Sequence, residues 1–155
     1  MSDFYLDSSA VAKRYLTETG TAWIRTLTDP ISGNRIRTAE ITRVEVAAAL
    51  AARHRAPGGI TRRERDRAVR LLTTHSILEY RLIPTSRAIL DRAVDLTQRH
   101  RLRGYDAVQL ATALAAESSL VAAGLPGLTF VAADADLVAA ARAEGLGAND
   151  PNLHP

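Results

Sequence analysis

The sequence predicts an α/β fold in which a central, mostly parallel sheet is covered by helices on both faces. Short apolar runs typical of strands alternate along the chain with longer segments of helical spacing, and this alternation is typical of three-layer α/β domains. The length of 155 residues, 46% of them hydrophobic, suits one domain with a full core. Because there is no internal repeat and no long linker, we expect residues 1–155 to form a single domain.

Four strands are expected, because four short apolar runs lie between turn residues. They cover residues 4–6, 36–38, 81–83 and 128–131. The last run, Leu-Thr-Phe-Val, has the strongest strand composition. The third is closed by Pro84, which has no backbone N–H to continue a sheet.

Seven helices are expected from apolar residues that recur at helical spacing. They cover residues 10–19, about 23–27, 41–54, 61–79, 86–100, about 105–123 and about 135–144. Gly20 ends the first of them, and the Ala-Pro-Gly-Gly turn at 56–59 ends the third. Ser8 and Ser9 are expected to cap the first helix, and Ser86 the fifth.

The composition excludes several kinds of site and location. Without cysteine the chain has no disulfide, thiolate zinc site or cysteine nucleophile, which fits a reducing compartment. No apolar run approaches the roughly 20 residues of a membrane span, and the first residues carry no basic leader. We therefore expect a cytoplasmic protein that does not associate with membranes. The formal charge of +3 is too small to indicate a polyanionic partner by itself.

Four acids stand where packing alone would not place a charge. Asp7 follows the first strand, and Asp134 follows the last. Glu45 is the only acid in the apolar stretch 44–50, and Asp106 opens an apolar helix. Ligands of open parallel sheets bind at the carboxyl ends of the strands, and a carboxylate near a core is costly unless it is paired or bound to a metal.

Helix capping is the alternative explanation for each of these acids. Asp7 and Asp134 are suitable N-terminal acids, and Asp106 follows Gly104 as a first-turn acid. Thr42 and Glu45 have the spacing of a capping box. Capping does not explain why four such acids occur in one small domain.

Convergence of these four acids would require a cation to offset their repulsion. The four histidines are scattered and there is no cysteine, so the ligands would be carboxylate oxygens, which select Mg²⁺ or Mn²⁺. Such ions lower the pKa of a bound water, orient it toward a phosphodiester and stabilise the leaving oxygen. The predicted chemistry is phosphodiester hydrolysis.

Four segments, taken in order, resemble the PIN-domain nucleases, and among them the VapC toxins of bacterial toxin–antitoxin pairs. The segments are Tyr5-Leu6-Asp7-Ser8-Ser9-Ala10, Thr42-Arg43-Val44-Glu45-Val46-Ala47, Tyr105-Asp106-Ala107-Val108-Gln109-Leu110-Ala111-Thr112-Ala113 and Phe130-Val131-Ala132-Ala133-Asp134. The resemblance extends over residues 4–145 and rests on their order and spacing.

This resemblance implies a PIN-like α/β/α fold with the acids in one pocket. It also implies an endoribonuclease, dependent on Mg²⁺ or Mn²⁺, that arrests translation by cutting a structured RNA such as tRNA or rRNA. Asp7 and Asp106 would be direct metal ligands, and Glu45 and Asp134 would complete the catalytic, metal-binding set. A cognate VapB-like antitoxin would inhibit the enzyme, and the chain would form a homodimer.

Three features leave the site assignment open. Ala132 stands where many relatives have a threonine or serine, so a hydroxyl that supports the metal site is missing. Asp136 competes with Asp134 as the fourth acid, and Glu40 competes with Glu45. Ser8 or Ser9 would orient a ligand or phosphate, or serve only as helix caps.

The arginine-rich segment 61–70 has two interpretations. Glu64 and Asp66 are interleaved with its arginines, which favours a solvated helix face over an RNA contact. By resemblance to the family, helices in this region would form a groove for an amphipathic antitoxin helix.

Two other functions compete with the nuclease. The first is a PIN-like domain that binds RNA or a partner without cutting. The second is a haloacid-dehalogenase-type phosphatase, but such enzymes need a second aspartate two residues after the first, and Ser9 stands there. A nucleotide-dependent oxidoreductase is excluded, because no G-x-G-x-x-G follows a strand.

Overall fold

Five parallel strands form the central sheet of the computed structural model, which describes residues 1–154. The strands are β1 (Asp3–Leu6), β2 (Arg35–Ala39), β3 (Tyr80–Ile83), β4 (Thr129–Val131) and β5 (Gly147–Asn149). Their order is β3-β2-β1-β4-β5, so β1 lies at the centre. In the register of the sheet, Tyr5 pairs with Arg37 on one side and Phe130 on the other. The predicted parallel α/β sheet is confirmed.

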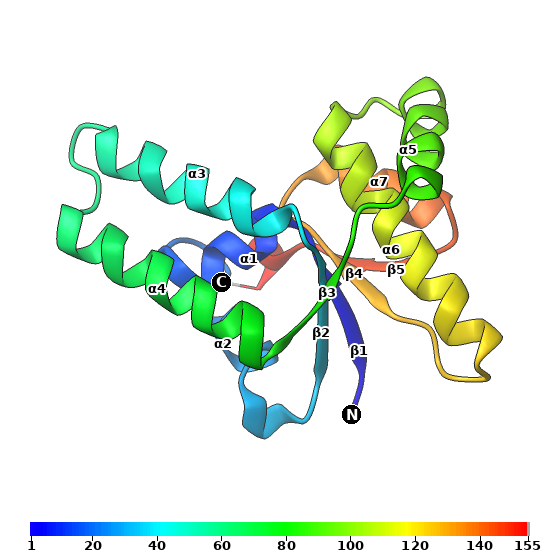
Figure 1. Cartoon of the computed structure of the whole chain (residues 1–155), viewed down its shortest axis with the longest axis horizontal. Coiled ribbons are helices and arrows are strands. Elements are labelled where there is room, and N and C mark those ends of the chain that lie inside the picture. The colour runs from blue at the N-terminus through cyan, green and yellow to red at the C-terminus, as the bar shows by residue number, and fades with distance from the viewer. Residues whose placement is uncertain (155) are drawn as a thin grey trace.

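Seven α-helices cover the sheet, and Figure 1 shows them on both of its faces. On one face lie α1 (Ser8–Tyr15), α2 (Thr21–Leu27), α3 (Thr42–Arg55) and α4 (Arg62–Leu78). On the other lie α5 (Arg87–Arg99), α6 (Gly104–Ala122) and α7 (Ala135–Ala143). Two short 3-10 helices, Pro30–Ser32 and Pro151–Leu153, complete the described chain. Each helix of residues 1–154 is too short or too polar to cross a membrane.

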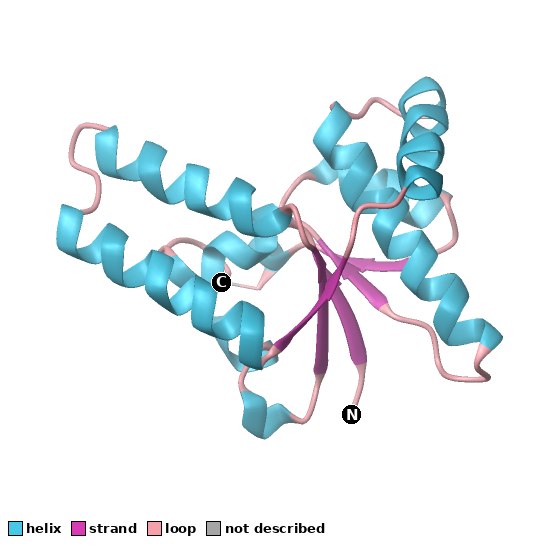
Figure 2. Ribbon diagram, in the orientation of Figure 1, coloured by secondary structure: helices cyan, strands magenta, loops and turns pink. Residues whose placement is uncertain are grey.

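The two faces of the sheet bury separate apolar clusters because successive strand residues point in opposite directions. Tyr5 and Phe130 pack under α5, α6 and α7, whereas Leu6 and Val131 pack under α1 and α3. The rings of Tyr5 and Phe130 stack with centroids 5.7 Å apart. Figure 2 shows the sheet as the layer between the two groups of helices.

The strand β5 was not predicted from the sequence. Its residues, Gly-Ala-Asn, have low strand propensity. It forms because it lies at the edge beside β4, where Thr129 pairs with Gly147 and the Ala132 N–H donates to the Asn149 carbonyl. Tertiary pairing, which a local pattern does not reveal, determines this element.

The start and end of the first helix also differ from the sequence prediction. The helix begins at Ser8 rather than near Ala10, and Asp7 is its cap. It ends at Tyr15 rather than Thr19, because Leu16 is extended and its carbonyl accepts a hydrogen bond from the Thr21 hydroxyl. The expectation that the serines cap α1 is wrong.

Candidate functional site

All four predicted acids lie at the end of the sheet where its parallel strands finish. Asp7 directly follows β1, and Glu45 stands in the first turn of α3, shortly after β2. Asp106 is in the first turn of α6, and Asp134 caps α7 after β4. The parallel topology brings these segments together although they are as many as 127 positions apart in the sequence, from 7 to 134.

Asp7 is the most buried of the four, with only 4% of its surface exposed. Its Oδ1 accepts hydrogen bonds from the Ser9 hydroxyl at 2.7 Å and from the Ala10 N–H at 2.9 Å. Burial, together with the charges of Asp106 and Glu45, raises the pKa of Asp7 to about 7 against the lowering effect of the two hydrogen bonds. A negative charge at this position is therefore unfavourable unless a cation offsets it.

Glu45 is not a capping residue. The N-cap of α3 is Ile41, which makes no side-chain cap, so the capping-box explanation is wrong. Glu45 Oε1 instead accepts hydrogen bonds from the Ser8 hydroxyl at 2.7 Å and from Gln109 Nε2 at 2.8 Å. These bonds connect α3 to α1 and α6 at the edge of the sheet.

Asp106 and Asp134 do support helix ends, as the alternative explanation predicts. Asp106 Oδ2 accepts from the Arg103 N–H at 3.3 Å, and Asp134 Oδ1 accepts from the Leu137 N–H at 3.0 Å. Partial burial raises the pKa of Asp106, and the charges of Asp134 and Glu45 raise it further. The electrostatic coupling links all four acids through Asp106 and Asp7.

Each of the four carboxylates uses only one of its oxygens for hydrogen bonds within residues 1–154. The bonded atoms are Asp7 Oδ1, Glu45 Oε1, Asp106 Oδ2 and Asp134 Oδ1. The second oxygen of each side chain accepts no hydrogen bond from this part of the protein. These hydrogen bonds and cation binding are therefore compatible, because the bonds fix each carboxylate through one oxygen and leave the other for a ligand.

The acids do not form a closed metal cage. Within residues 1–154 no group of three or more His, Cys, Asp or Glu side chains is arranged to hold a metal ion by itself. Mg²⁺ commonly takes only one or two protein carboxylates and keeps water and phosphate oxygens as its other ligands. The donor chemistry of the four free oxygens fits such an ion.

Two cavities meet at Asp106. One, of about 710 Å³, is lined by Glu45 and Asp106 together with Leu90, Val94 and Tyr105 among others. The other, of about 550 Å³, contains the acids Asp106, Asp134 and Asp136 and the basic residues His100, Arg101 and Arg103. Carboxylates and arginine guanidinium groups thus line the same cavity.

Sequence and structure comparisons agree on the family of this fold. The PIN domain family model matches residues 4–143. The chain belongs to the PIN-domain family. No curated protein shows significant sequence similarity to this PIN domain.

The solved structures that resemble this PIN domain include a toxin–antitoxin complex and a VapC toxin. A toxin–antitoxin complex from Klebsiella pneumoniae is 20% identical, with a TM-score of 0.57 over 96% of this chain and 97% of that one. VapC20 of Mycobacterium tuberculosis, described as a sarcin-ricin loop cleaving toxin, is 16% identical, with a TM-score of 0.61 over 92% and 95%. VapBC2 from Rickettsia felis, bound to a promoter DNA fragment, is 12% identical, with a TM-score of 0.63 over 96% and 98%. At these identities the likeness establishes the fold.

The structure gives the surroundings of the positions near the four acids that the sequence left open. Ala132 is fully buried and has no hydroxyl, but the Ser9 hydroxyl accepts a 2.8 Å hydrogen bond from the next residue's N–H, that of Ala133. Asp136 is exposed and lines the cavity beside Asp134. Glu40 is exposed and lines neither of the two cavities. Ser8 and Ser9 bind Glu45 and Asp7, which is an orienting arrangement.

Sequence reasoning missed Gln109 as part of the PIN site. Its amide lies within hydrogen-bond distance of Ser8, Thr42 and Glu45. A signal was present, because Gln109 is a polar residue in the apolar run Ala-Val-Gln-Leu-Ala, three positions after Asp106. Residues at this spacing share a helix face.

Proposed function

We propose that this protein is a divalent-metal-dependent endoribonuclease and the toxin of a toxin–antitoxin pair, which cuts a structured RNA. The observation that carries the proposal is the set of four coupled carboxylates, each fixed through one oxygen and open at the other, in a PIN fold. The described activity of the similar VapC20 structure, cleavage of the sarcin-ricin loop, supports RNA as the substrate class.

Asp7 and Asp106 would hold Mg²⁺ or Mn²⁺, with Glu45 and Asp134 completing the acidic set. When bound, the ion supplies an activated water and charge stabilisation for phosphodiester hydrolysis. Ser9 and the Ala10 N–H hold Asp7 in place, and Ser8 holds Glu45. These contacts fix the carboxylates before substrate arrives, which reduces the reorganisation needed during the reaction.

Arg101 and Arg103 would bind RNA phosphates beside the acids. Both are exposed and line the 550 Å³ cavity with Asp106, and neither forms an ion pair within residues 1–154. Guanidinium groups suit phosphate oxygens because their N–H donors match them in pairs. A phosphodiester bound by these arginines would lie beside Asp106 and Asp134, whose negative charge the bound ion would offset.

Incubation of the purified chain with total cellular RNA in Mg²⁺, Mn²⁺ or EDTA tests the proposal. We expect discrete cleavage that requires the metal and is lost in Asp106→Asn, while the matched exposed variant Asp91→Asn on α5 cleaves normally. Binding of RNA without cleavage in every metal would overturn the proposal in favour of a non-catalytic PIN-like domain.

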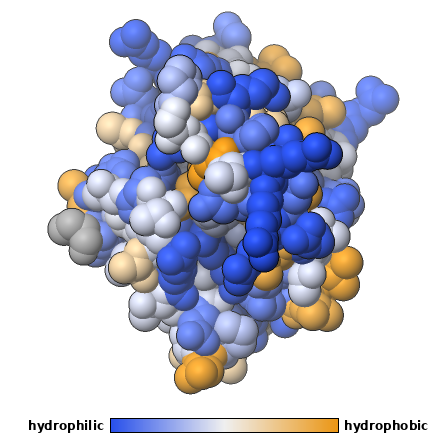
Figure 3. Space-filling view, turned by 90° about the vertical axis from the view of Figure 1, so that its left-hand side faces the viewer, coloured by the Kyte–Doolittle hydropathy of each residue, from blue (hydrophilic) through white to orange (hydrophobic). Residues whose placement is uncertain are grey.

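An antitoxin would bind on the side of the sheet that α1, α2, α3 and α4 cover, away from α5 and α6. A cavity of about 690 Å³ beside α1, α2 and α4 combines apolar Leu16, Ile60 and Leu71 with Arg53 and Arg67. Within residues 1–154 these two arginines form no ion pair. Such a lining suits an amphipathic helix with acidic residues, as expected of a VapB-like antitoxin. The side of the molecule that carries the α3–α4 hairpin is mainly hydrophilic, with small apolar areas, in Figure 3.

A second copy of the chain would pack against the apolar rim of the cavity beside Glu45. Leu90, Val94 and Tyr105 are exposed there, and Tyr105 has 65% of its surface accessible. Exposed apolar patches rimmed by polar residues mark interaction surfaces. Sedimentation is expected to show a homodimer for the wild type and a monomer for Val94→Glu. A monomeric wild type would exclude this arrangement.

A further inference from the structure

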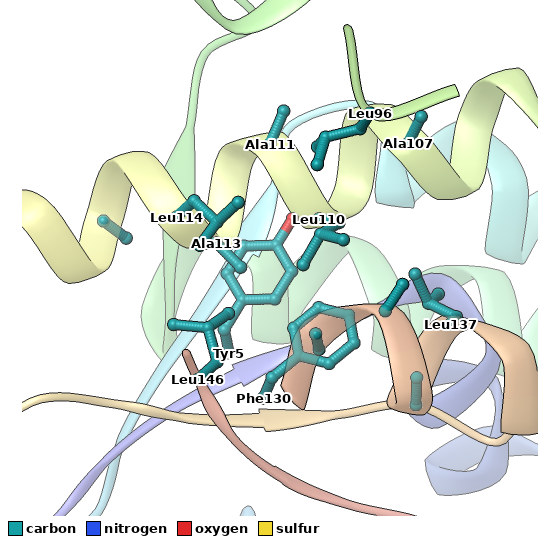
Figure 4. Close-up of a cluster of buried hydrophobic side chains, with 14 of the residues drawn as sticks. Tyr5, Leu96, Ala107, Leu110, Ala111, Ala113, Leu114, Phe130, Leu137 and Leu146 are labelled. Atoms are coloured by element: carbon teal, nitrogen blue, oxygen red, sulfur yellow. The ribbon is translucent and has the colours of Figure 1, made fainter. Parts of the chain in front are cut away.

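Gln109 occupies a buried position beneath the four acids. It lies on α6 three residues after Asp106, and only 2% of its surface is exposed. The Tyr5 hydroxyl donates a 2.7 Å hydrogen bond to Gln109 Oε1. Figure 4 shows the Tyr5 oxygen directed toward α6. A buried amide with this partner has a fixed place in the core.

The nitrogen of the same amide faces three oxygens of the site. Gln109 Nε2 lies 2.8 Å from Glu45 Oε1 and 2.9 Å from both Ser8 Oγ and Thr42 Oγ1. An amide carries two N–H groups, so one of them is shared between two of these acceptors. Because Ser8 also donates to Glu45 Oε1, two donors converge on this one carboxylate oxygen.

Tyr5 determines which way the amide points. The Tyr5 hydroxyl is buried and donates its hydrogen to the amide over 2.7 Å. The amide oxygen can only accept, and it therefore faces Tyr5. A flipped Gln109 would place that oxygen against Glu45 Oε1, where two acceptors repel each other.

We propose that Gln109 is a positioning residue that holds Glu45 by Oε1 and so keeps Oε2 available to the cavity that Glu45 and Asp106 line. This inference rests on the proposed nuclease function. The chain of contacts runs from Tyr5 on β1 through Gln109 on α6 to Glu45 on α3, and it joins the core to the acidic edge. Outer partners that orient ligating carboxylates typically change metal affinity or activity about 10–100-fold when removed.

The test compares Mn²⁺ binding by the full chain without RNA, measured from the electron paramagnetic resonance signal of free Mn²⁺. Gln109→Met removes both the donors and the acceptor at nearly constant length. Tyr5→Phe keeps the amide and removes only the group that orients it. Gln98→Met controls for the substitution at an exposed glutamine, and Leu110→Ala controls for lost core stability on the same helix.

We expect Gln109→Met to weaken Mn²⁺ binding about 10–100-fold and to raise by the same factor the Mn²⁺ concentration that gives half-maximal RNA cleavage. Tyr5→Phe is expected to weaken binding in the same direction, whereas Leu110→Ala lowers the melting temperature and leaves the affinity unchanged. A folded Gln109→Met with wild-type affinity overturns the inference. If that variant does not fold, wild-type affinity in Tyr5→Phe overturns it.

The same measurements separate this inference from the proposed function. A wild type that binds Mn²⁺ but never cleaves RNA contradicts the nuclease, and the affinities of the variants still decide the role of Gln109. If the wild type cleaves RNA and Gln109→Met binds Mn²⁺ with the same affinity as the wild type, only the role of Gln109 is contradicted.

Discussion

The hydroxyl of Ser9 accepts a 2.8 Å hydrogen bond from the backbone N–H of Ala133. The same hydroxyl donates to Asp7 Oδ1 at 2.7 Å. One small side chain at the start of α1 therefore joins the acid that follows β1 to the loop that carries Asp134. Ala132 contributes no hydroxyl, and Ser9 supplies one of the polar contacts that fix this loop.

Removal of that hydroxyl is expected to affect both stability and cleavage. In Ser9→Ala the partly buried Ala133 N–H loses its partner, which costs about 1–3 kcal/mol of the free energy of unfolding. RNA cleavage is expected to fall about 10–100-fold, as for other groups that orient metal ligands. Urea melts and cleavage assays measure the two effects. Ser118→Ala on α6, whose hydroxyl bonds only to its own helix, is the control, and equal behaviour of the two variants would contradict the account.

Asp7 gives the protein a predictable dependence of stability on pH. Its folded-state pKa of about 7 lies above the roughly 3.9 of an unfolded aspartate. Folding therefore favours the protonated form, so stability from this group is fully present below about pH 4 and is lost as the pH rises through 7. At about 1.4 kcal/mol per pKa unit, the cost above pH 7 is on the order of 4 kcal/mol.

Asp7→Asn should remove this cost. An asparagine still accepts the hydrogen bonds of Ser9 and Ala10 but carries no charge. We expect the variant to be more stable than the wild type at pH 8 and similar to it at pH 4, by chemical denaturation at both values. Asp29→Asn, at the cap of Pro30–Ser32, should show no such difference. Destabilisation of Asp7→Asn at pH 8 would mean that the carboxylate serves mainly as a cap.

Substitution at Asp134 and Asp136 separates the two candidates for the fourth acid. Asp134→Asn keeps the cap of α7, so its melting temperature should stay near that of the wild type. Its cleavage rate should nevertheless fall by more than about 100-fold, since loss of a ligand exceeds the effect of an outer partner. Asp136→Asn should change the rate less than Asp134→Asn. The measurement is the cleavage rate of each variant on the same RNA. A larger loss of rate in Asp136→Asn than in Asp134→Asn would assign the role of fourth acid to Asp136.

Divalent metal is expected to stabilise the fold. The free carboxylate oxygens repel one another, and an ion that binds only the folded state adds about 2.7 kcal/mol at 100 times its dissociation constant. Thermal melts with Mn²⁺ should therefore shift upward in the wild type and much less in the double variant Asp7→Asn/Asp106→Asn. A shift of the same size in both proteins would show that the ion binds elsewhere.

The sequence predicted most of the fold because its strands and helices have strong local patterns. The four predicted strands are present, since runs such as Leu-Thr-Phe-Val are rich in β-branched and aromatic residues that favour strands. In contrast, β5 depends on pairing with β4, and the start of α1 depends on which side chain caps it. Neither feature can be predicted from a local sequence pattern.

The positions of the acids could also be predicted, but their contacts could not. That Asp7 and Asp134 each follow a strand is visible in the sequence, and the parallel sheet, in which β1 lies beside β4, then places them at one edge. The partners of Glu45 come from α1 and α6, which only the packed structure brings together. For the same reason, the capping box suggested by Thr42 and Glu45 was wrong, because Thr42 instead bonds Thr38 and Gln109.

Anomalous diffraction from crystals soaked in Mn²⁺ shows whether the free oxygens of these carboxylates bind a divalent metal. We expect a Mn²⁺ peak within coordination distance of Asp7 and Asp106, on the side of their unbonded oxygens, that disappears in Asp106→Asn. A wild-type crystal that binds Mn²⁺ only at other residues, or an unchanged peak in Asp106→Asn, would contradict this expectation.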